Sequence, residues 1–257
     1  MTTRRPRRLG MAVNHYLDRP EAEFLTAIRR VRAAGMTGIE LNTPDPDLID
    51  HLAVLIRAEQ LELMAIATGR MACHDGASPT AGEVLSRAAA AAERHHAKLV
   101  VGLIRGRASL ARDLVERFLR ETLGRILVVH PHIQVVIEPI AAREAAWPNT
   151  LADGLDCLDR FGWRNEPRIK LLADAFHLVP SGEMDQWEAA RPWIGHVQIA
   201  GPARAAPPLA DPAIDAQLAQ ALRFAADHGL DCGFELAANA TDEAERCAAW
   251  AASVLAE

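Results

Sequence analysis

Residues 135–140 read Val135-Val136-Ile137-Glu138-Pro139-Ile140, a short apolar run that contains one carboxylate. A nearly continuous apolar run of this length is typical of a parallel strand that is covered on both faces. A carboxylate inside such a strand would be buried, and burying a charge is costly unless something compensates it. The segment therefore predicts a buried parallel strand with a functional group near its end.

Seven similar runs occur along the chain, and stretches with helical periodicity lie between them. This alternation indicates repeated βα units, and 257 residues is close to the usual length of one closed α/β barrel. We therefore predict an α/β protein with a single (β/α)8 TIM barrel domain over residues 1–257. The eight predicted strands are Leu9–Val13, Gly38–Leu41, Leu61–Ala67, Leu99–Leu103, Val135–Ile140, Ile169–Ala173, His196–Ala200 and Cys232–Leu236.

Helices are predicted between these strands. Gly35 fits the position just after the end of a helix, where a left-handed backbone is common. The predicted helices are Glu21–Ala34, Asp47–Glu59, one that opens near Ser78 and Pro79 and contains Ala88–Ala92, Leu110–Val129, Thr150–Arg160, Met184–Trp187, Ile214–His228 and Asp242–Leu255.

The composition is that of a soluble globular protein, with 50% hydrophobic and 24% charged residues and a net charge of −6. The basic run from Arg4 to Arg8 is short, so we expect a solvated tail and no nucleic-acid partner. We also expect no membrane partner and a cytoplasmic location, because the chain has no apolar stretch of membrane-spanning length and no secretory signal. Four cysteines without a C-x-x-C pair are expected to be buried free thiols: Cys73, Cys157, Cys232 and Cys247.

Four consecutive predicted strands, the fifth to the eighth, each carry an oxygen-bearing side chain near the end. In a barrel of this kind the carboxyl ends of the strands form the active-site face. Three buried carboxylates there would repel one another unless a cation neutralised them. Oxygen ligands favour Mn²⁺ or Mg²⁺, so we predict one divalent metal ion held by Glu138, Asp174, Gln198 and Glu235. The alternative is that each acid is satisfied separately by Arg, Lys or backbone donors.

The segments around these positions resemble the xylose isomerase-like barrels, with the hydroxypyruvate isomerase and ketose 3-epimerase groups as the most similar members. They are IEPI at Glu138, LLADAFH ending at His177, GHVQIAG around Gln198 and GFEL at Glu235, and GIEL at residues 38–41 adds a weaker likeness. The resemblance implies one metal at the four strand ends. It also implies that Glu144, His177 and Arg204 contact oxygens of the substrate.

The implied reaction is isomerisation or epimerisation of a small carbohydrate or hydroxy-keto acid through a metal-stabilised enediolate. Glu138 and Glu235 lie on nonadjacent strands, so one would remove a proton beside the carbonyl and the other would return one. The segment 201–212 departs from the relatives' usual sequence, which leaves the substrate open. We read it as part of the substrate rim and allow for a homo-oligomer.

Other functions remain as alternatives. A sugar or inosose dehydratase begins with the same proton abstraction, and a non-catalytic sugar-binding barrel would keep the fold without turnover. A three-zinc AP endonuclease is disfavoured, because the predicted fourth strand ends without a histidine. Among the other histidines, His15 and His74 are candidates to line the pocket. His196, at the start of its predicted strand, is expected to have a structural role. We expect His95, His96, His130 and His132 on the surface, away from the rim.

Overall fold

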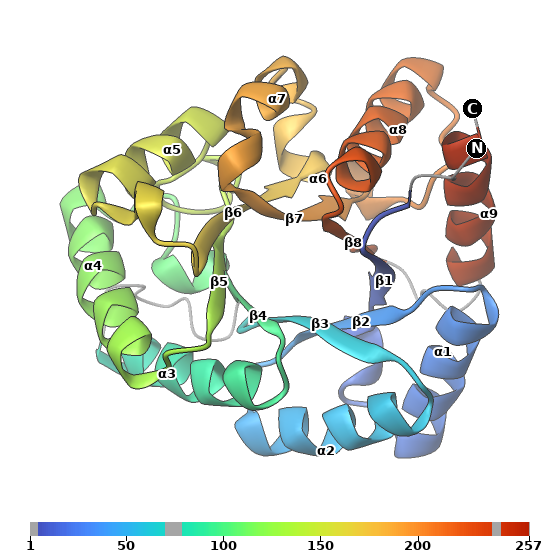
Figure 1. Ribbon diagram of the computed structural model, residues 1–257, viewed down its shortest axis with the longest axis horizontal. Helices are drawn as coiled ribbons and strands as arrows, with labels where there is room; N and C mark the ends of the chain where they lie inside the picture. Colours follow the sequence, from blue (N-terminus) through green and yellow to red (C-terminus); the bar gives the residue numbers. More distant parts are fainter. Residues whose placement is uncertain (1–4, 70–78, 238–242, 257) are drawn as a thin grey trace.

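The computed structural model describes residues 5–69, 79–237 and 243–256, and its centre is a ring of eight parallel strands. The strands follow one another in chain order and close into a barrel, as Figure 1 shows in a view down the ring. The predicted TIM barrel is therefore confirmed. The strands are β1 Arg8–Ala12, β2 Gly38–Asn42, β3 Glu62–Ala67, β4 Lys98–Val101, β5 Gln134–Ile137, β6 Ile169–Asp174, β7 Ile194–Ile199 and β8 Asp231–Phe234.

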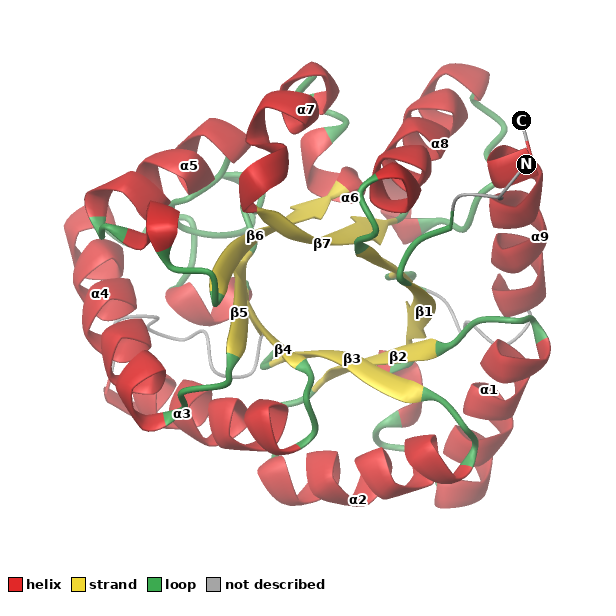
Figure 2. Cartoon of the chain, in the orientation of Figure 1, coloured by secondary structure: helices red, strands yellow, loops and turns green. Residues whose placement is uncertain are grey.

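Helices surround the ring on its outer side (Figure 2). Helices α2, α5 and α8 begin behind side-chain caps, since Asp45, Thr150 and Asp211 accept hydrogen bonds from first-turn N–H groups. The helices are α1 Glu21–Ala33, α2 Pro46–Ala58, α3 Pro79–Arg94, α4 Arg112–Val129, α5 Leu151–Arg160, α6 Ala175–Leu178, α7 Trp187–Ala190, α8 Pro212–Asp227 and α9 Glu243–Ala256. The left-handed residue predicted after the first helix is confirmed, because Gly35 has a φ of +83°.

Several predicted boundaries are wrong by a few residues. Strand β5 ends at Ile137, because Pro139 has no N–H with which to continue the ladder. Strand β4 ends at Val101, since Leu103 already belongs to a 3-10 turn. The single helix predicted at Met184–Trp187 is a 3-10 turn followed by the short helix α7. The start predicted for the last helix, Asp242, lies outside the described residues.

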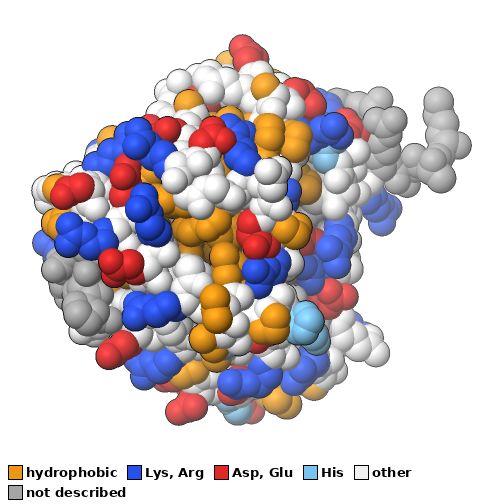
Figure 3. Space-filling model, turned by 60° about the vertical axis from the view of Figure 1, so that its left-hand side comes forward, with side chains coloured by type: hydrophobic (Ala, Val, Ile, Leu, Met, Phe, Trp, Pro, Cys, Tyr) orange, Lys and Arg blue, Asp and Glu red, His pale blue; other side chains and the backbone are white. Residues whose placement is uncertain are grey.

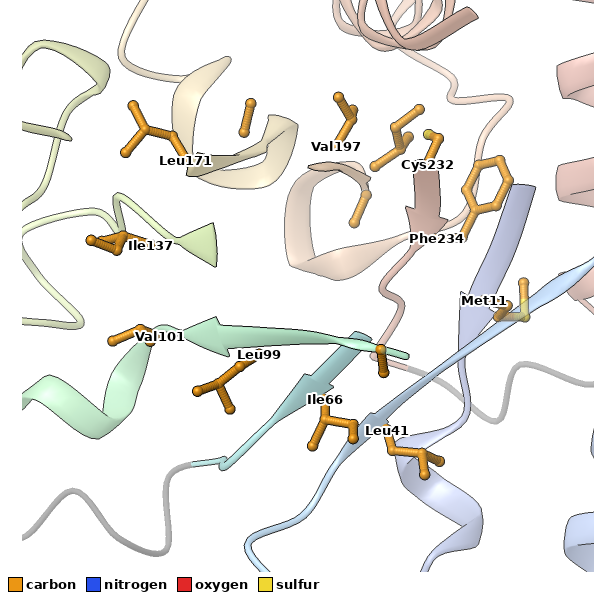
Figure 4. Packing of buried hydrophobic residues seen from close by; sticks show 14 of the residues in the cluster. Met11, Leu41, Ile66, Leu99, Val101, Ile137, Leu171, Val197, Cys232 and Phe234 are labelled. Carbon is orange, nitrogen blue, oxygen red and sulfur yellow. The ribbon is translucent and has the colours of Figure 1, made fainter. Parts of the chain in front are cut away.

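The main core lies between the ring and the helices. Alternate strand residues face outward, and Figure 4 shows Leu41, Ile137, Val197 and Phe234 around the outside of the ring. A second, smaller apolar cluster consists of Ala65, Val100, Val136 and Leu172. Because side chains along a strand alternate between its two faces, the neighbours of the outward residues point inward. Inward positions beyond this second cluster carry the polar groups described below.

Acidic and basic side chains are interspersed on the face shown in Figure 3. No helix in the described part of the chain is both long enough and apolar enough to span a membrane. Cys157, Cys232 and Cys247 are buried free thiols, as predicted, and burial raises the pKa of Cys157 to about 12. Cys73 lies outside the described residues.

Candidate functional site

The barrel register brings the predicted site residues together at the carboxyl ends of β5 to β8. Asp174 is paired with Gln198 across β6 and β7, and Gln198 is paired with Gly233, two residues before Glu235. A cavity of about 220 Å³ opens at this end of the barrel. Six of the seven predicted residues line it, and the seventh, Asp174, is fully buried beside them. The lining includes Glu138, Glu144, His177, Gln198, Arg204 and Glu235.

Glu138 occupies the inward position just beyond the end of β5. Its backbone N–H donates to the carbonyl oxygen of Val101, which extends the pairing with β4 by one residue. The neighbouring strand end has a glycine, and a Cβ at Gly102 would lie only 2.4 Å from Glu138 Oε2. Burial, together with the charges of Asp174 and Glu235, raises the pKa of Glu138 well above its ordinary value.

Asp174 is held in one orientation by the helix that follows it. Its Oδ1 accepts a hydrogen bond of 2.9 Å from the backbone N–H of Phe176 at the start of α6. Its Oδ2 therefore faces the site, 3.3 Å from Arg204 Nη1 and 3.7 Å from His177 Nε2. The strand-to-helix transition thus turns the second carboxylate oxygen of Asp174 toward Arg204 and His177 at the site.

Arg204 supplies the positive charge of the site. Its Nη1 donates to Glu235 Oε2 over 2.6 Å, and its guanidinium stacks on the ring of Phe176 at 4.3 Å. Ala203 and Arg204 both have a φ of 55°, a left-handed conformation that non-glycine residues seldom adopt. Such backbone strain is often found at functional sites. Burial alone would lower the pKa of Arg204, but Asp174, Glu235 and Glu138 raise it above its ordinary value.

Glu235 follows the end of β8 and lines the same cavity as Glu138. The pKa of Glu235 is raised to about 7, mainly by burial; the pairing with Arg204 lowers it, while the charges of Asp174 and Glu40 add to the rise. A carboxyl group with a pKa near neutrality can accept and release a proton under ordinary conditions.

His177 lies on α6 between three acids. Its Nε2 is 3.6 Å from Glu138 Oε1, and it accepts a hydrogen bond of 3.4 Å from Arg204 Nη2. Its Nδ1 is buried without a hydrogen-bond partner in the described part of the protein and lies 4.0 Å from Glu144 Oε1. Burial lowers the pKa of His177, and the attraction of Asp174 offsets this only in part. The ring therefore offers one polar atom that a ligand could satisfy.

Two of the acids and this histidine lie close enough together that they could hold a metal ion. Ligand atoms of Glu138, Asp174 and His177 all lie within 4.8 Å of one another, so this group could hold a metal ion. Gln198 donates its amide N–H to Glu40, which leaves the amide oxygen for another partner. Glu235 is paired with Arg204 and lies outside the group of three. His177, predicted to contact the substrate and not to bind the metal directly, thus belongs to the group that could hold the ion.

Two charged residues near the site were missing from the sequence-based prediction. Glu40 lies on β2 and is buried inside the barrel, where it meets His196 and Gln198. Arg105 is fully buried and donates to several backbone carbonyl oxygens, including those of Gly102 and Trp147, so it anchors the loop after β5. Glu40 showed the same signal as Glu138, a carboxylate inside an apolar strand. Arg105 gave no such signal, because it follows β4 in a short 3-10 turn and the backbone carbonyl oxygens that it meets, such as that of Trp147, lie far away in the sequence.

The remaining histidines fall into three groups. His196 is buried inside the barrel, whereas His15 is exposed and contacts the carbonyl oxygen of Leu236, so it is not part of the cavity wall. The prediction of four surface histidines is wrong for two, because the rings of His95 and His130 are mostly buried and pair with Asp50 and Glu93. His96 and His132 are exposed, and His74 lies outside the described residues.

The fold and the site together define a class of protein, the TIM barrels with an acidic cavity at the carboxyl ends of the strands. The match to a family model is more specific. Residues 28–211, more than half of the chain, match the model of the xylose isomerase-like TIM barrel, and the chain belongs to this family. The resemblance found in the sequence is thereby confirmed.

Solved structures with the same fold include sugar epimerases and a dehydratase, each below 25% identity. An L-ribulose 3-epimerase is 21% identical with a TM-score of 0.78, and the match covers 97% of this chain and 94% of that one. The D-allulose 3-epimerase from Methylomonas sp., in complex with D-allulose, is 19% identical with a TM-score of 0.74, covering 97% and 98%. The probable 3-DHS dehydratase from Bacillus anthracis is 18% identical with a TM-score of 0.66, covering 97% and 99%. A search of curated proteins finds no match.

Proposed function

We propose that this protein is a divalent-metal-dependent isomerase or epimerase that acts on a small carbohydrate or hydroxy-keto acid. The observation that carries the proposal is the meeting of two buried carboxylates, Glu138 and Asp174, with a third, mostly buried one, Glu235, at one small cavity. Ionised carboxylates that lie close together in a buried site repel one another, so the arrangement is costly unless a cation neutralises them. Such clusters of acids with shifted pKa values are typical of functional sites. The sugar epimerases that share the fold add support for this class of reaction.

The proposed metal ligands are Glu138, Asp174, Gln198 and Glu235, with Mn²⁺ or Mg²⁺ as the ion because all four offer oxygen. In support of this set, Gln198 donates its amide N–H to Glu40, which leaves its amide oxygen available, and Oδ1 alone of the two Asp174 oxygens accepts from the backbone among the described residues. When bound, the cation would supply positive charge beside the substrate carbonyl oxygen as negative charge develops there. Arg204 already provides part of this charge through its contacts with Asp174 and Glu235.

Proton transfer is assigned to Glu138 and Glu235. They project from β5 and β8, which are not neighbours in the ring, so they can approach a bound substrate carbon from different sides. One carboxylate removes the proton beside the carbonyl, and the other delivers a proton to the opposite face of the carbon. The raised pKa of each residue suits a group that must hold a proton between these two steps.

The substrate oxygens are assigned to His177, Arg204 and Glu144. The unpartnered Nδ1 of His177 and the nearby carboxylate of Glu144 can bind a hydroxyl group as donor and acceptor respectively. Arg204 belongs to the 201–212 segment, so the loop that departs from the relatives brings a charged group into the cavity. Differences in this loop are therefore expected to select the substrate.

Solvent exchange followed by NMR tests the proposal. The Mn²⁺-loaded protein is incubated in D₂O with a panel of ketoses and hydroxy-keto acids, and we expect deuterium at the carbon beside the carbonyl of an accepted substrate. Glu138→Gln and Glu235→Gln should each lower the exchange rate by about 10²-fold to 10⁴-fold, because an amide cannot accept the proton. Calorimetric titration with Mn²⁺ verifies that both variants still bind metal.

The outcomes separate the candidate functions. Undiminished exchange in both metal-loaded variants would reject the two-carboxylate scheme. Sugar binding without exchange in the wild type would favour a non-catalytic binding protein. Release of water with a dehydrated product would identify a lyase that uses the same first step.

A further inference from the structure

Glu40 lies inside the barrel below the site, and both of its carboxylate oxygens accept hydrogen bonds from β7. Its Oε1 is 2.7 Å from His196 Nε2, and its Oε2 is 2.6 Å from Gln198 Nε2. Glu40 is only 3% exposed, so its partners in the protein replace water almost completely. The Glu40 carboxylate therefore holds two side chains of β7, a strand that is not next to β2 in the ring.

Lys98 determines which nitrogen of His196 carries the proton. Its ammonium group lies 3.3 Å from His196 Nδ1, and an ammonium can only donate. His196 Nδ1 is therefore the acceptor, and the proton is on Nε2, where it is donated to Glu40. Since one oxygen of Glu40 is committed to this bond, the other is available to Gln198.

A glycine on β8 makes room for this arrangement. A Cβ added at Gly233 would lie 1.8 Å from Glu40 Oε1, which is far below any real contact distance. Gly233 is paired with Gln198, so the space is opened next to the residue that Glu40 contacts. Strands β2, β7 and β8 are thus all adapted to place one carboxylate at this position.

We propose that Glu40 is a positioning residue that orients the Gln198 amide so that its carbonyl oxygen faces the metal site. A carboxylate cannot donate, so the amide nitrogen must face Glu40, and the oxygen on the same carbon is turned away from it. Gln198 lines the cavity, so the oxygen is available to a cation there. The inference rests on the proposed function, because it assumes that Gln198 is a ligand.

Calorimetric titration of Glu40→Gln with Mn²⁺ tests this role. The substituted amide must present its NH₂ group to either His196 or Gln198, and a reversed Gln198 amide would turn nitrogen instead of oxygen toward the ion. Loss of such an outer partner costs about 10-fold to 100-fold in metal affinity. We expect a loss of this size in Glu40→Gln and no further loss when it is added to Gln198→Ala.

Two further variants distinguish positioning from folding. Gly233→Ala keeps the charge of Glu40 but displaces its carboxylate, and it should weaken Mn²⁺ binding in the same way even if Glu40→Gln folds poorly. Glu183→Gln removes another buried carboxylate, one that accepts hydrogen bonds from Leu151 and Ser181, and it should leave Mn²⁺ affinity unchanged. Thermal unfolding in EDTA measures the stability of every variant.

The result that overturns the inference differs from the one that overturns the proposed function. If the wild type binds Mn²⁺ and Glu40→Gln binds it equally well, the positioning role is wrong while the metal site stands. An equal loss of affinity with and without Gln198 also rejects it, since Glu40 would then act through its charge. A wild type that binds no Mn²⁺ rejects the metal site itself and the inference with it.

Discussion

Arg204 illustrates how a single residue balances the charges of the cavity. Its guanidinium contacts Glu235 at 2.6 Å and Asp174 at 3.3 Å, and the side chain is about one-fifth exposed. Two carboxylates that burial makes costly to ionise thus share one permanent cation. A divalent ion placed among the same acids would also neutralise part of their negative charge. Without that ion, the stability of the protein should depend on Arg204.

We predict that Arg204→Met lowers the free energy of unfolding of the metal-free protein by about 3 kcal/mol at pH 8, because the fully buried Asp174 and the mostly buried Glu235 lose their partner. Added Mn²⁺ should raise the melting temperature more in this variant than in the wild type. Thermal unfolding in EDTA and in Mn²⁺ measures both effects. Arg160→Met, which breaks an exposed pair with Asp156, is the control and should cost less than about 1 kcal/mol. An equal Mn²⁺ effect in Arg204→Met and wild type would contradict the idea.

At the scale of the elements, the site depends on how each strand ends. Pro139 stops the ladder just after Glu138, and Asp174 both ends β6 and caps α6. The end of β4 is followed by Gly102, whose missing side chain leaves the space that the Glu138 carboxylate fills. The position of Glu138 is therefore set partly by a residue on the neighbouring strand end.

We predict that Gly102→Ala displaces the Glu138 carboxylate and lowers turnover by about 10²-fold, as expected for a shift of a catalytic group by about 1 Å. Steady-state kinetics on the accepted substrate, with Mn²⁺ titration, measures the effect. Gly124→Ala in α4 is a matched control, since the added Cβ would meet no atom within 4 Å beyond its chain neighbours and the nearby backbone of its own helix. The control should gain about 0.5–1 kcal/mol in stability and keep its activity. Full turnover in Gly102→Ala would show that the position of Glu138 matters little.

At the scale of the whole molecule, a charged cluster ties the first and last strands to the far side of the ring. Asp231 on β8 accepts hydrogen bonds from Arg8 on β1 and from Lys98 on β4, the latter at 2.5 Å. The Asp231 side chain is fully buried. Burial alone would raise the pKa of Asp231, but the contacts with Arg8 and Lys98 hold it far below its ordinary value. The cluster therefore stabilises the closed barrel only while Asp231 is ionised.

We predict that Asp231→Asn lowers the free energy of unfolding by about 3 kcal/mol at neutral pH. Because the folded-state pKa lies below that of the unfolded chain, about 3.9, this contribution is present above that value and is lost as the pH falls below it. The difference between wild type and variant should therefore be constant above about pH 5 and shrink progressively as the pH falls below about 4. Denaturant unfolding across this range measures it, with Asp159→Asn, an exposed acid paired with Arg164, as control. A difference that does not change with pH would contradict the assignment.

Much of the fold could be predicted because each strand carries its own signal. Apolar runs such as 135–140 and 169–173 mark buried strands, and a carboxylate or amide near the end of a run marks the face on which a site can form. Boundaries were less certain, since a strand ends where its last ladder hydrogen bond ends. That point depends on the neighbouring strand, as Glu138 shows by bonding to Val101.

The sequence by itself determined that the chain forms a (β/α)8 barrel and which side chains stand at the ends of β5 to β8, because both follow from local periodicity and position along the strand. Only the tertiary structure decided that Arg204 pairs with Asp174 and Glu235, that His177 joins the acids, and that Glu40 holds Gln198. These contacts join residues 30 or more positions apart in most cases, across the closed ring. They depend on the barrel's register and on the space left by glycines, which no single segment of the chain encodes.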